Sequence, residues 1–268
     1  MPTFLEEILE LKKIRVENDK KNYQRSKIQE QRPKHLLRQA LESSEEINII
    51  AEIKRASPSK GIINDQIDVA EVAQDYEEGG AVAISVLTEE DRFQGSLDDL
   101  RLARSVVSIP ILRKDFIFDE FQIHEAKEAG ADAILLIVAM LDDEKLLNLR
   151  QLAEDELGLD ALVEVHTLEE LERAKNIGAT IIGINNRDLH SFKVSLDVSR
   201  ELIKHAPKDA LMIAESGLKT RDELLELKEL GFHGFLMGET LMRQLDAAEK
   251  LRQLAMNDKD WTMWVRFN

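Results

Sequence analysis

Residues 119–139 read DEFQIHEAKEAGADAILLIVA and contain one complete unit of the fold. The first half is polar with apolar residues at helical spacing, Gly130 follows, and the second half is a continuous apolar run. Glycine supplies the left-handed conformation that ends a helix, and a run that is apolar on both faces is typical of a buried parallel strand. The segment therefore predicts a helix, a glycine cap and a strand.

Three more copies of this order lie along the chain, with the helix-ending glycine at Gly80, Gly178 and Gly231. The strand candidates are rich in Ile, Val, Leu and Ala, and they are 47–54, 81–87, 110–114, 132–139, 160–165, 180–185, 210–215 and 234–237. The helix candidates alternate with them and are 68–78, 96–106, 119–129, 142–156, 167–177, 195–205, 220–230 and 244–255. Such alternation predicts right-handed crossovers and a parallel sheet, and eight units favour a closed barrel over an open sheet.

The length of the chain agrees with this architecture, because 268 residues suit one α/β domain of the (β/α)₈, or TIM, barrel type, for which about 250 residues are typical. We expect a single domain, with an N-terminal helical extension over residues 1–46, the barrel over 47–256 and a C-terminal tail over 257–268. The extension is interrupted by Pro33 and is expected to pack on the barrel as a cap. No Gly-x-Gly-x-x-Gly follows the first strand, so a dinucleotide-binding fold has little support.

Composition excludes several classes of function. The formal net charge of −16 argues against a nucleic-acid partner and against an anionic membrane surface, although a small anionic substrate can still bind in a locally positive pocket. The sequence has no cysteine, so disulfides and thiolate metal sites are impossible. The first residues do not resemble a secretory signal, and the longest apolar run, near 133–141, is too short to span a bilayer. We therefore expect a cytoplasmic protein.

Charged and polar residues gather where the predicted strands end, which is the end of a barrel that carries the active site. The residues at these positions are Glu52, Lys54, Lys114, Glu164, Asn185, Arg187 and Glu215. A charge at a strand end can simply mark the point where the strand reaches water, but five strands that end in the same way favour a shared site. Acidic and basic groups are balanced here, and such a mixture suits proton transfer better than anion storage.

Two further segments predict a phosphorylated substrate. Glycines follow the last two strands, in Glu215-Ser216-Gly217 and in Met237-Gly238-Glu239, where exposed backbone N–H groups can bind phosphate. The loop after the first strand, 55–61, is small, basic and turn-prone, and we expect it to cover anionic groups of the substrate. An ordinary surface turn is the alternative.

The segment 50–61, IAEIKRASPSKG, resembles the signature of the indole-3-glycerol phosphate synthase family. The likeness continues through LRKDF at 112–116, LVEVH at 162–166, INNRDL at 184–189, AESG at 214–217 and GETLM at 238–242, and it covers about residues 47–245. It implies ring closure of 1-(2-carboxyphenylamino)-1-deoxyribulose 5-phosphate to indole-3-glycerol phosphate, with release of CO₂ and water, in tryptophan biosynthesis. It also implies that no metal and no organic cofactor take part.

The same resemblance implies roles for four candidate catalytic residues. Lys114 is expected to be the general acid that protonates the carbonyl oxygen of the substrate as the aromatic carbon attacks. Glu164 is expected to assist loss of water and of the proton that restores the aromatic ring. Lys54 would hold the carboxylate or phosphate of the substrate and is a second candidate proton donor, and Glu52 would orient Lys114 or a hydroxyl. Which lysine serves which step stays open.

The binding residues follow from the same comparison. Asn185, Glu215 and Ser216 would bind hydroxyl groups, and Arg187 would contact the substrate. Ser57, Pro58 and Phe116 would line the side occupied by the anthranilate ring, and backbone groups of Gly217, Gly238 and Glu239 would bind phosphate. Glu239 departs from the family, which often has a small residue there, and a carboxylate facing the phosphate would weaken its binding.

Other interpretations remain open at this point. A different phosphate-binding barrel, such as a sugar-phosphate isomerase, would explain the late glycines but not the two lysines with the loop around Ser57. A barrel that binds a phosphorylated ligand without turnover would need no ordered set of acids and bases. Glu164 and His166 could be half of a metal site, but no second histidine shares their face. We expect a small-molecule substrate, a monofunctional chain that lacks a fused isomerase barrel, and a monomer, with weak self-association as the alternative.

Overall fold

The structure is a computed structural model, and it describes residues 3–23, 32–43 and 46–255. Eight parallel strands form a closed barrel, as the sequence predicted, in the order β1-β10-β9-β8-β7-β6-β5-β4. Their bounds are β1 Ile49–Ile53, β4 Ala83–Leu87, β5 Ile111–Lys114, β6 Ala133–Ile137, β7 Asp160–Val165, β8 Ile181–Asn185, β9 Leu211–Glu215 and β10 Gly234–Met237. The barrel closes where β1 pairs with β10, with Ile49 beside Phe235.

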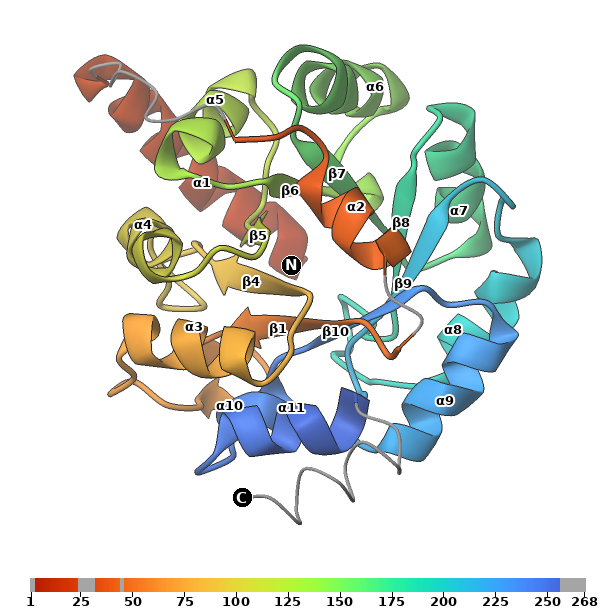
Figure 1. Cartoon of the computed structure of the whole chain (residues 1–268). Coiled ribbons are helices and arrows are strands. Elements are labelled where there is room, and N and C mark those ends of the chain that lie inside the picture. Colours follow the sequence, from red (N-terminus) through yellow and green to blue (C-terminus); the bar gives the residue numbers. More distant parts are fainter. Residues whose placement is uncertain (1–2, 24–31, 44–45, 256–268) are drawn as a thin grey trace.

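Helices follow the strands and surround the barrel (Figure 1). They are α3 Val69–Glu78, α4 Leu97–Val106, α5 Glu120–Ala129, α6 Asp143–Gln151, α7 Leu168–Asn176, α8 Asp197–Leu202, α9 Arg221–Leu230 and α11 Ala247–Ala255. The junction glycines end their helices as expected, with positive φ angles that run from 72° at Gly178 to 114° at Gly231.

Four local features differ from the sequence prediction. The helix expected over 142–156 is α6 followed by a π-helical turn, Leu152–Glu156. The helix expected from residue 244 begins at Ala247, because the side chain of Asp246 accepts a hydrogen bond from Glu249 N and caps it. A short helix, α10 Glu239–Met242, precedes it, and the loop after β1 holds the small hairpin of β2 Ala56–Ser57 and β3 Gly61–Ile62.

The N-terminal extension forms two helices that both pack on the apolar side chains inside the barrel. Helix α2, Leu36–Ser43, places Leu37 and Leu41 in the cluster of apolar side chains inside the barrel, and Asn48 Nδ2 donates to the Leu41 carbonyl over 2.9 Å. Helix α1, Phe4–Asn22, packs Ile8 on the same cluster. In Figure 1, α2 lies in front of the strands and α1 lies behind them. The predicted C-terminal tail lies outside the described residues.

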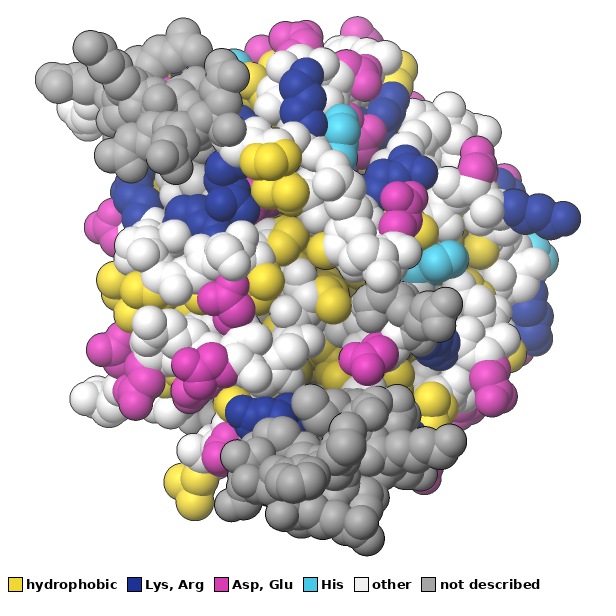
Figure 2. Space-filling model, in the orientation of Figure 1, with side chains coloured by type: hydrophobic (Ala, Val, Ile, Leu, Met, Phe, Trp, Pro, Cys, Tyr) yellow, Lys and Arg dark blue, Asp and Glu magenta, His cyan; other side chains and the backbone are white. Residues whose placement is uncertain are grey.

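The core has two layers, one inside the barrel and one between the strands and the helices. Strand side chains alternate between the two, so that Ile50 packs inside while Ile49 and Ala51 face the helices. On the face of the molecule drawn in Figure 2, basic and acidic side chains lie in small mixed groups. Within the described ranges, no helix is both long and apolar enough to cross a membrane.

Candidate active site

A cavity of about 990 Å³ opens at the C-terminal ends of the strands. Every residue that the sequence singled out as a site candidate lines it, namely Glu52, Lys54, Ser57, Pro58, Lys114, Phe116, Glu164, Asn185, Arg187, Glu215, Ser216, Gly217, Gly238 and Glu239. They come from six strands and the segments that follow them, so regions far apart in the chain meet at one end of the barrel. This is the end at which barrels of this class carry their active sites.

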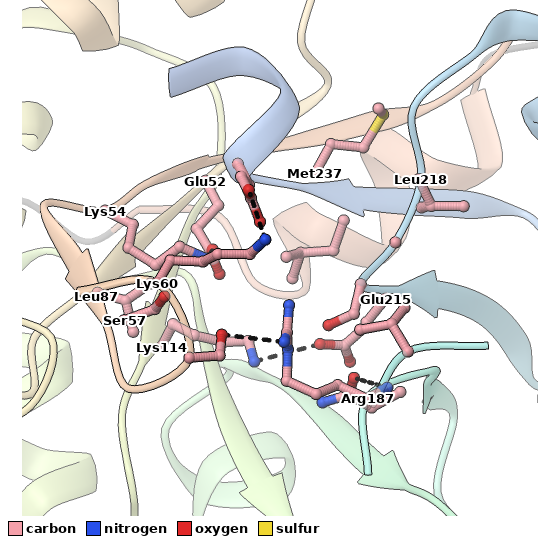
Figure 3. A pocket seen from close by; sticks show the side chains of 18 of the residues that line it. Glu52, Lys54, Ser57, Lys60, Leu87, Lys114, Arg187, Glu215, Leu218 and Met237 are labelled. Carbon is pink, nitrogen blue, oxygen red and sulfur yellow. Dashed lines mark hydrogen bonds and ion pairs between the residues drawn. The ribbon is translucent and has the colours of Figure 1, made fainter. Parts of the chain in front are cut away.

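The ammonium group of Lys114 lies between two buried carboxylates. Its Nζ is 3.1 Å from Glu164 Oε2 and 3.2 Å from Glu215 Oε2, and Figure 3 shows Lys114 and Glu215 pointing toward one another. Burial disfavours the charge on this lysine, but the carboxylates of Glu164, Glu215 and Glu52 outweigh burial and raise the pKa of Lys114. Lys114 therefore holds its proton, as a general acid must before it reacts.

Glu164 and Glu215 differ in electrostatic environment although both contact Lys114. Burial would raise the pKa of Glu164, but Lys114 and His166 lower it well below its ordinary range. Burial and the neighbouring charge of Glu164 raise the pKa of Glu215 to about 7, despite the attraction of Lys114. Glu164 is therefore an ionised carboxylate, whereas Glu215 titrates near neutral pH.

The side chain of Glu215 has few fixed partners. It is buried, and neither of its oxygens accepts a hydrogen bond from any described residue. Gly183 on β8 leaves the room that this carboxylate occupies, since a Cβ at residue 183 would overlap Glu215 Oε1. The hydrogen-bonding capacity of Glu215 is therefore available to the contents of the cavity.

Glu52 and Lys54 form an ion pair at the end of β1. Strand alternation brings both side chains to the cavity, as the sequence predicted, and Figure 3 shows them on the side opposite Glu215. A side chain at residue 238 would overlap Glu52 Oε1, so Gly238 is needed for this close approach. From the sequence, we had expected Gly238 to serve phosphate binding alone.

Arg187 joins two loops across the cavity. Its Nη1 donates to Ser59 Oγ over 3.1 Å and to the Phe192 carbonyl over 3.3 Å. Its backbone N–H donates to Asn185 Oδ1 over 3.0 Å. The loop after β1, which contains Ser57 and the β2–β3 hairpin, is thus connected to the loop after β8.

The loops after β9 and β10 form another side of the cavity. Ser216 and Gly217 follow β9 with positive φ angles of 67° and 83°. The carboxylate of Glu239 lies 3.2 Å from Arg243 Nε and 3.7 Å from Lys60 Nζ, so two cations offset the charge of this unusual residue. Both cations line the cavity; Lys60 belongs to the basic loop 55–61 that the sequence indicated, whereas Arg243 was not predicted.

Aromatic side chains form a further wall, and three of them were not predicted. The ring centroid of Phe4 lies 6.3 Å from that of Phe116 and 5.3 Å from that of Phe192, and Phe93 lies 6.1 Å from Phe116. Of these four rings, Phe116 is the one that was assigned a place in the site from the sequence. Phe4 belongs to α1, which was expected to be only a cap.

A buried ion pair fixes α1 beside the site. Lys12 Nζ lies 2.7 Å from Asp115 Oδ1, and Asp115 follows Lys114 directly. Arg113 and Thr88 also contact this carboxylate, at 3.0 and 2.7 Å from Oδ2. Burial opposes ionisation of Asp115, but Lys12 and Arg113 lower its pKa below the ordinary range. Hydrophobic spacing alone could not reveal a buried lysine in α1.

His166 lies behind Glu164 rather than in the cavity lining. Its Nε2 is 3.3 Å from Glu164 Oε1, and its Nδ1 is 3.2 Å from Glu170 Oε2. The metal site considered from the sequence would need further ligands, and the described part of the chain holds no group of three or more side chains placed to bind a metal. His166 is thus placed to form ion pairs with Glu164 and Glu170 rather than to bind a metal.

Comparison with known proteins shows which family the chain resembles. The family model of indole-3-glycerol phosphate synthase matches residues 5–254. Indole-3-glycerol phosphate synthase of Carboxydothermus hydrogenoformans is 46% identical over 265 residues, covering 94% of this chain and 99% of that protein. The enzyme of Acetivibrio thermocellus is 50% identical over 214 residues, covering 80% and 82%. A solved structure of thiamine phosphate pyrophosphorylase from Pyrococcus furiosus is similar in fold alone. Its TM-score is 0.59 and its sequence identity is 18%, and the match covers 81% of this chain and 95% of that one.

Proposed function

Because the chain belongs to the indole-3-glycerol phosphate synthase family, we propose that it closes the indole ring in the cavity around Lys114. The enzyme is a carboxy-lyase that converts 1-(2-carboxyphenylamino)-1-deoxyribulose 5-phosphate to indole-3-glycerol phosphate, CO₂ and water. The main support for placing the reaction in this cavity is that the ammonium group of Lys114 lies there between two buried carboxylates.

The proton balance of the reaction defines what the site must supply. The substrate carboxylate leaves as CO₂ and the carbonyl oxygen leaves as water, so that oxygen receives two protons while one proton is removed from carbon. One proton is therefore consumed in each turnover. A site for this reaction needs at least one donor and one acceptor close to the same substrate, which matches the mixture of lysines and glutamates in the cavity.

Lys114 is proposed to give the first proton to the carbonyl oxygen. Negative charge develops on that oxygen as the aromatic carbon attacks, and a fixed ammonium in a buried site stabilises it more than it stabilises the ground state. Lys54, on the side of the cavity opposite Glu215, is the candidate for the second proton, and Glu52 holds its ammonium group in place.

Glu164 is proposed to remove the proton from carbon that completes the aromatic ring. Its carboxylate is ionised, as a base requires, and its Oε2 is 3.1 Å from Lys114 Nζ. The proton that Glu164 takes can pass over this distance to Lys114, which restores both groups. Glu215 and Asn185, whose polar atoms also line the cavity, are proposed to bind hydroxyl groups of the substrate together with Ser216.

The two ends of the substrate suit different walls of the cavity. We propose that phosphate binds at the backbone of Gly217, Gly238 and Glu239, with Lys60 and Arg243 as nearby cations. The anthranilate ring is proposed to lie against Phe116, with Ser57 and Pro58 beside it and Arg187 at the loop connection.

The chain is also proposed to act as a cytoplasmic monomer on a small-molecule substrate. A monomer is supported because every residue of the proposed site comes from one chain. A cytoplasmic location is supported by the biosynthetic role of its relatives. Size-exclusion chromatography with light scattering tests the monomer, and a dimer mass at micromolar concentration would contradict it.

The test of the proposed acid is Lys114→Ala, assayed by the fluorescence of the indole product. We expect kcat to fall by about 10³-fold, the middle of the range for general acid–base catalysis. Lys114→Arg should stay almost as inactive, because guanidinium keeps the charge but does not release a proton. The matched control is Lys204→Ala, a surface lysine paired with Glu201, which should keep wild-type activity. Full activity in Lys114→Arg would show that charge suffices and would remove the acid role.

A further inference from the structure

A row of alternating charges extends from the cavity into the protein. It runs from Lys114 to Glu164 over 3.1 Å, from Glu164 to His166 over 3.3 Å and from His166 to Glu170 over 3.2 Å. The two oxygens of Glu164 have separate partners, since Oε2 faces Lys114 and Oε1 faces His166. The proposed base is therefore held between two basic groups, of which only Lys114 lines the cavity.

His166 is fixed by its surroundings rather than by the substrate. Its side chain is 11% exposed, and the backbone N–H of the same residue donates to Glu170 Oε2 over 2.7 Å. Glu170 lies in the first turn of α7, which Thr167 caps. Nε2 of His166 makes no hydrogen bond within the described residues, so its contact with Glu164 is an ion pair.

The charges around this histidine favour the imidazolium form. Burial alone would lower its pKa, but the carboxylates of Glu164 and Glu170 raise the pKa of His166 to about 10. Lys114 on β5, Glu215 on β9 and Glu52 on β1 are the further charged groups that face Glu164 or its lysine partner. His166 thus adds a second positive charge to a cluster in which acids are in excess.

The second charge matters at one point of the reaction. When Lys114 gives its proton to the substrate oxygen, its amine becomes neutral and Glu164 loses the nearest cation. Glu164 would then lie buried near Glu215 and Glu52 with no compensating charge from Lys114, and it would bind a proton too early. A base that is already protonated cannot take the proton from carbon.

We propose that His166, as an imidazolium, is a positioning residue that keeps Glu164 ionised and oriented after Lys114 has released its proton. This inference rests on the roles proposed above for Lys114 and Glu164. No atom of His166 needs to touch the substrate. Glu170 is the group that keeps His166 charged and holds its ring in place.

The first test is His166→Gln, because the amide can donate to Glu164 but carries no charge. We expect kcat to fall about tenfold, KM to stay within about twofold, and the acidic limb of the pH profile of kcat to move up by about one unit. The limb moves up because a carboxylate that loses a neighbouring cation binds its proton more tightly. His166→Lys, which restores a charge, should return the limb toward that of the wild type.

A second variant tests the same idea from the other side of the ring. Glu170→Gln keeps an acceptor for the backbone of His166 but removes the charge that stabilises the imidazolium. We expect the basic limb, where His166 loses its proton, to move down by about one unit while the acidic limb stays in place. This variant remains informative if substitution of His166 itself prevents folding.

The control is His35→Asn, because His35 contacts the first residue of β7, at the end of that strand opposite Glu164. His35 Nδ1 is 3.2 Å from Asp160 Oδ1, so it also pairs with a carboxylate of β7, but far from the cavity lining. Its kcat and pH profile should match the wild type. Unshifted limbs in both His166→Gln and Glu170→Gln would overturn the inference while leaving Lys114 untouched, whereas activity in Lys114→Arg would remove the proposed acid and this inference with it.

Discussion

Two buried carboxylates at opposite ends of the barrel, Asp132 and Glu215, have opposite surroundings. At the N-terminal end, Asp132 accepts from Arg32 Nε over 2.7 Å, from Arg104 Nη1 over 2.9 Å and from Ile111 N over 2.9 Å. At the C-terminal end, neither oxygen of Glu215 accepts a hydrogen bond within the described chain. A carboxylate with fixed donors stabilises the fold, while one without them retains capacity for a substrate.

Strand β7 shows the same contrast within six residues. Its first residue, Asp160, accepts from the Arg38 backbone N–H over 3.0 Å and pairs with His35, which ties α2 to the barrel. Glu164, near its other end, faces a cavity and two basic groups. The difference shows that the donors around a carboxylate separate the two kinds: Asp160 has partners that hold the fold together, whereas Glu164 faces the cavity.

The largest expected effect is on stability at the N-terminal end. Asp132→Ala leaves two arginines and the Ile111 N–H without their shared acceptor, so the free energy of unfolding should fall by about 3 kcal/mol. The value of kcat at 25 °C should not change. Urea unfolding followed by circular dichroism measures the first quantity. A drop in kcat without a loss of stability would contradict the proposal that Asp132 serves the fold and not the reaction.

Glu215→Gln should give the opposite result, with kcat lowered about 100-fold, or about 2.7 kcal/mol in activation free energy. Its stability should change little at pH 8, because the lost attraction to Lys114 is offset by relief of the burial of the charge and of its repulsion from Glu164. The pKa of Glu215 is raised from 4.5 to about 7 in the folded protein, so its contribution to stability is fully present below pH 4.5 and is lost as the pH rises through 7. Unfolding measured from pH 4.5 to 8 should therefore show a growing advantage of the variant, and a constant difference would contradict the assignment.

Two glycine substitutions should give the smallest effects and the sharpest contrast. Gly234→Ala crowds Leu41 of α2 and Ile213, so it should lower the free energy of unfolding by about 2 kcal/mol with kcat unchanged. Gly183→Ala displaces the carboxylate of Glu215 and should lower kcat about tenfold with a smaller loss of stability. Equal effects of both variants on kcat would show that the two ends are mechanically coupled.

The barrel could be predicted from the sequence because its signals are local. Each strand is a short apolar run, and four of the helices are followed by a junction glycine such as Gly130, so the order of the units can be read along the chain. The strand-end residues were predictable for the same reason, because parallel strands of a closed barrel bring Lys114, Glu164 and Glu215 to one rim.

Residues that reach the cavity from other elements could not be predicted in this way. Phe4 arrives through the docking of α1, which depends on the pairing of Lys12 with Asp115, and no periodic pattern encodes that contact. The setting of Glu239 depends on Lys60 and Arg243, which come from separate loops. The proposed role of His166 could not be inferred from the sequence because its partner Glu170 belongs to the next helix.

The pairing of Lys12 with Asp115 has a consequence for the nascent chain. Helix α1 is synthesised before the barrel strands, and the acceptor of Lys12 lies 103 residues later, so α1 lacks this partner while the first strands are made. Strand β1 waits longer, because one of its two neighbours is β10, with Ile49 beside Phe235. The aromatic wall that includes Phe4 therefore cannot be complete until the chain has been made through Phe192, 188 residues after Phe4.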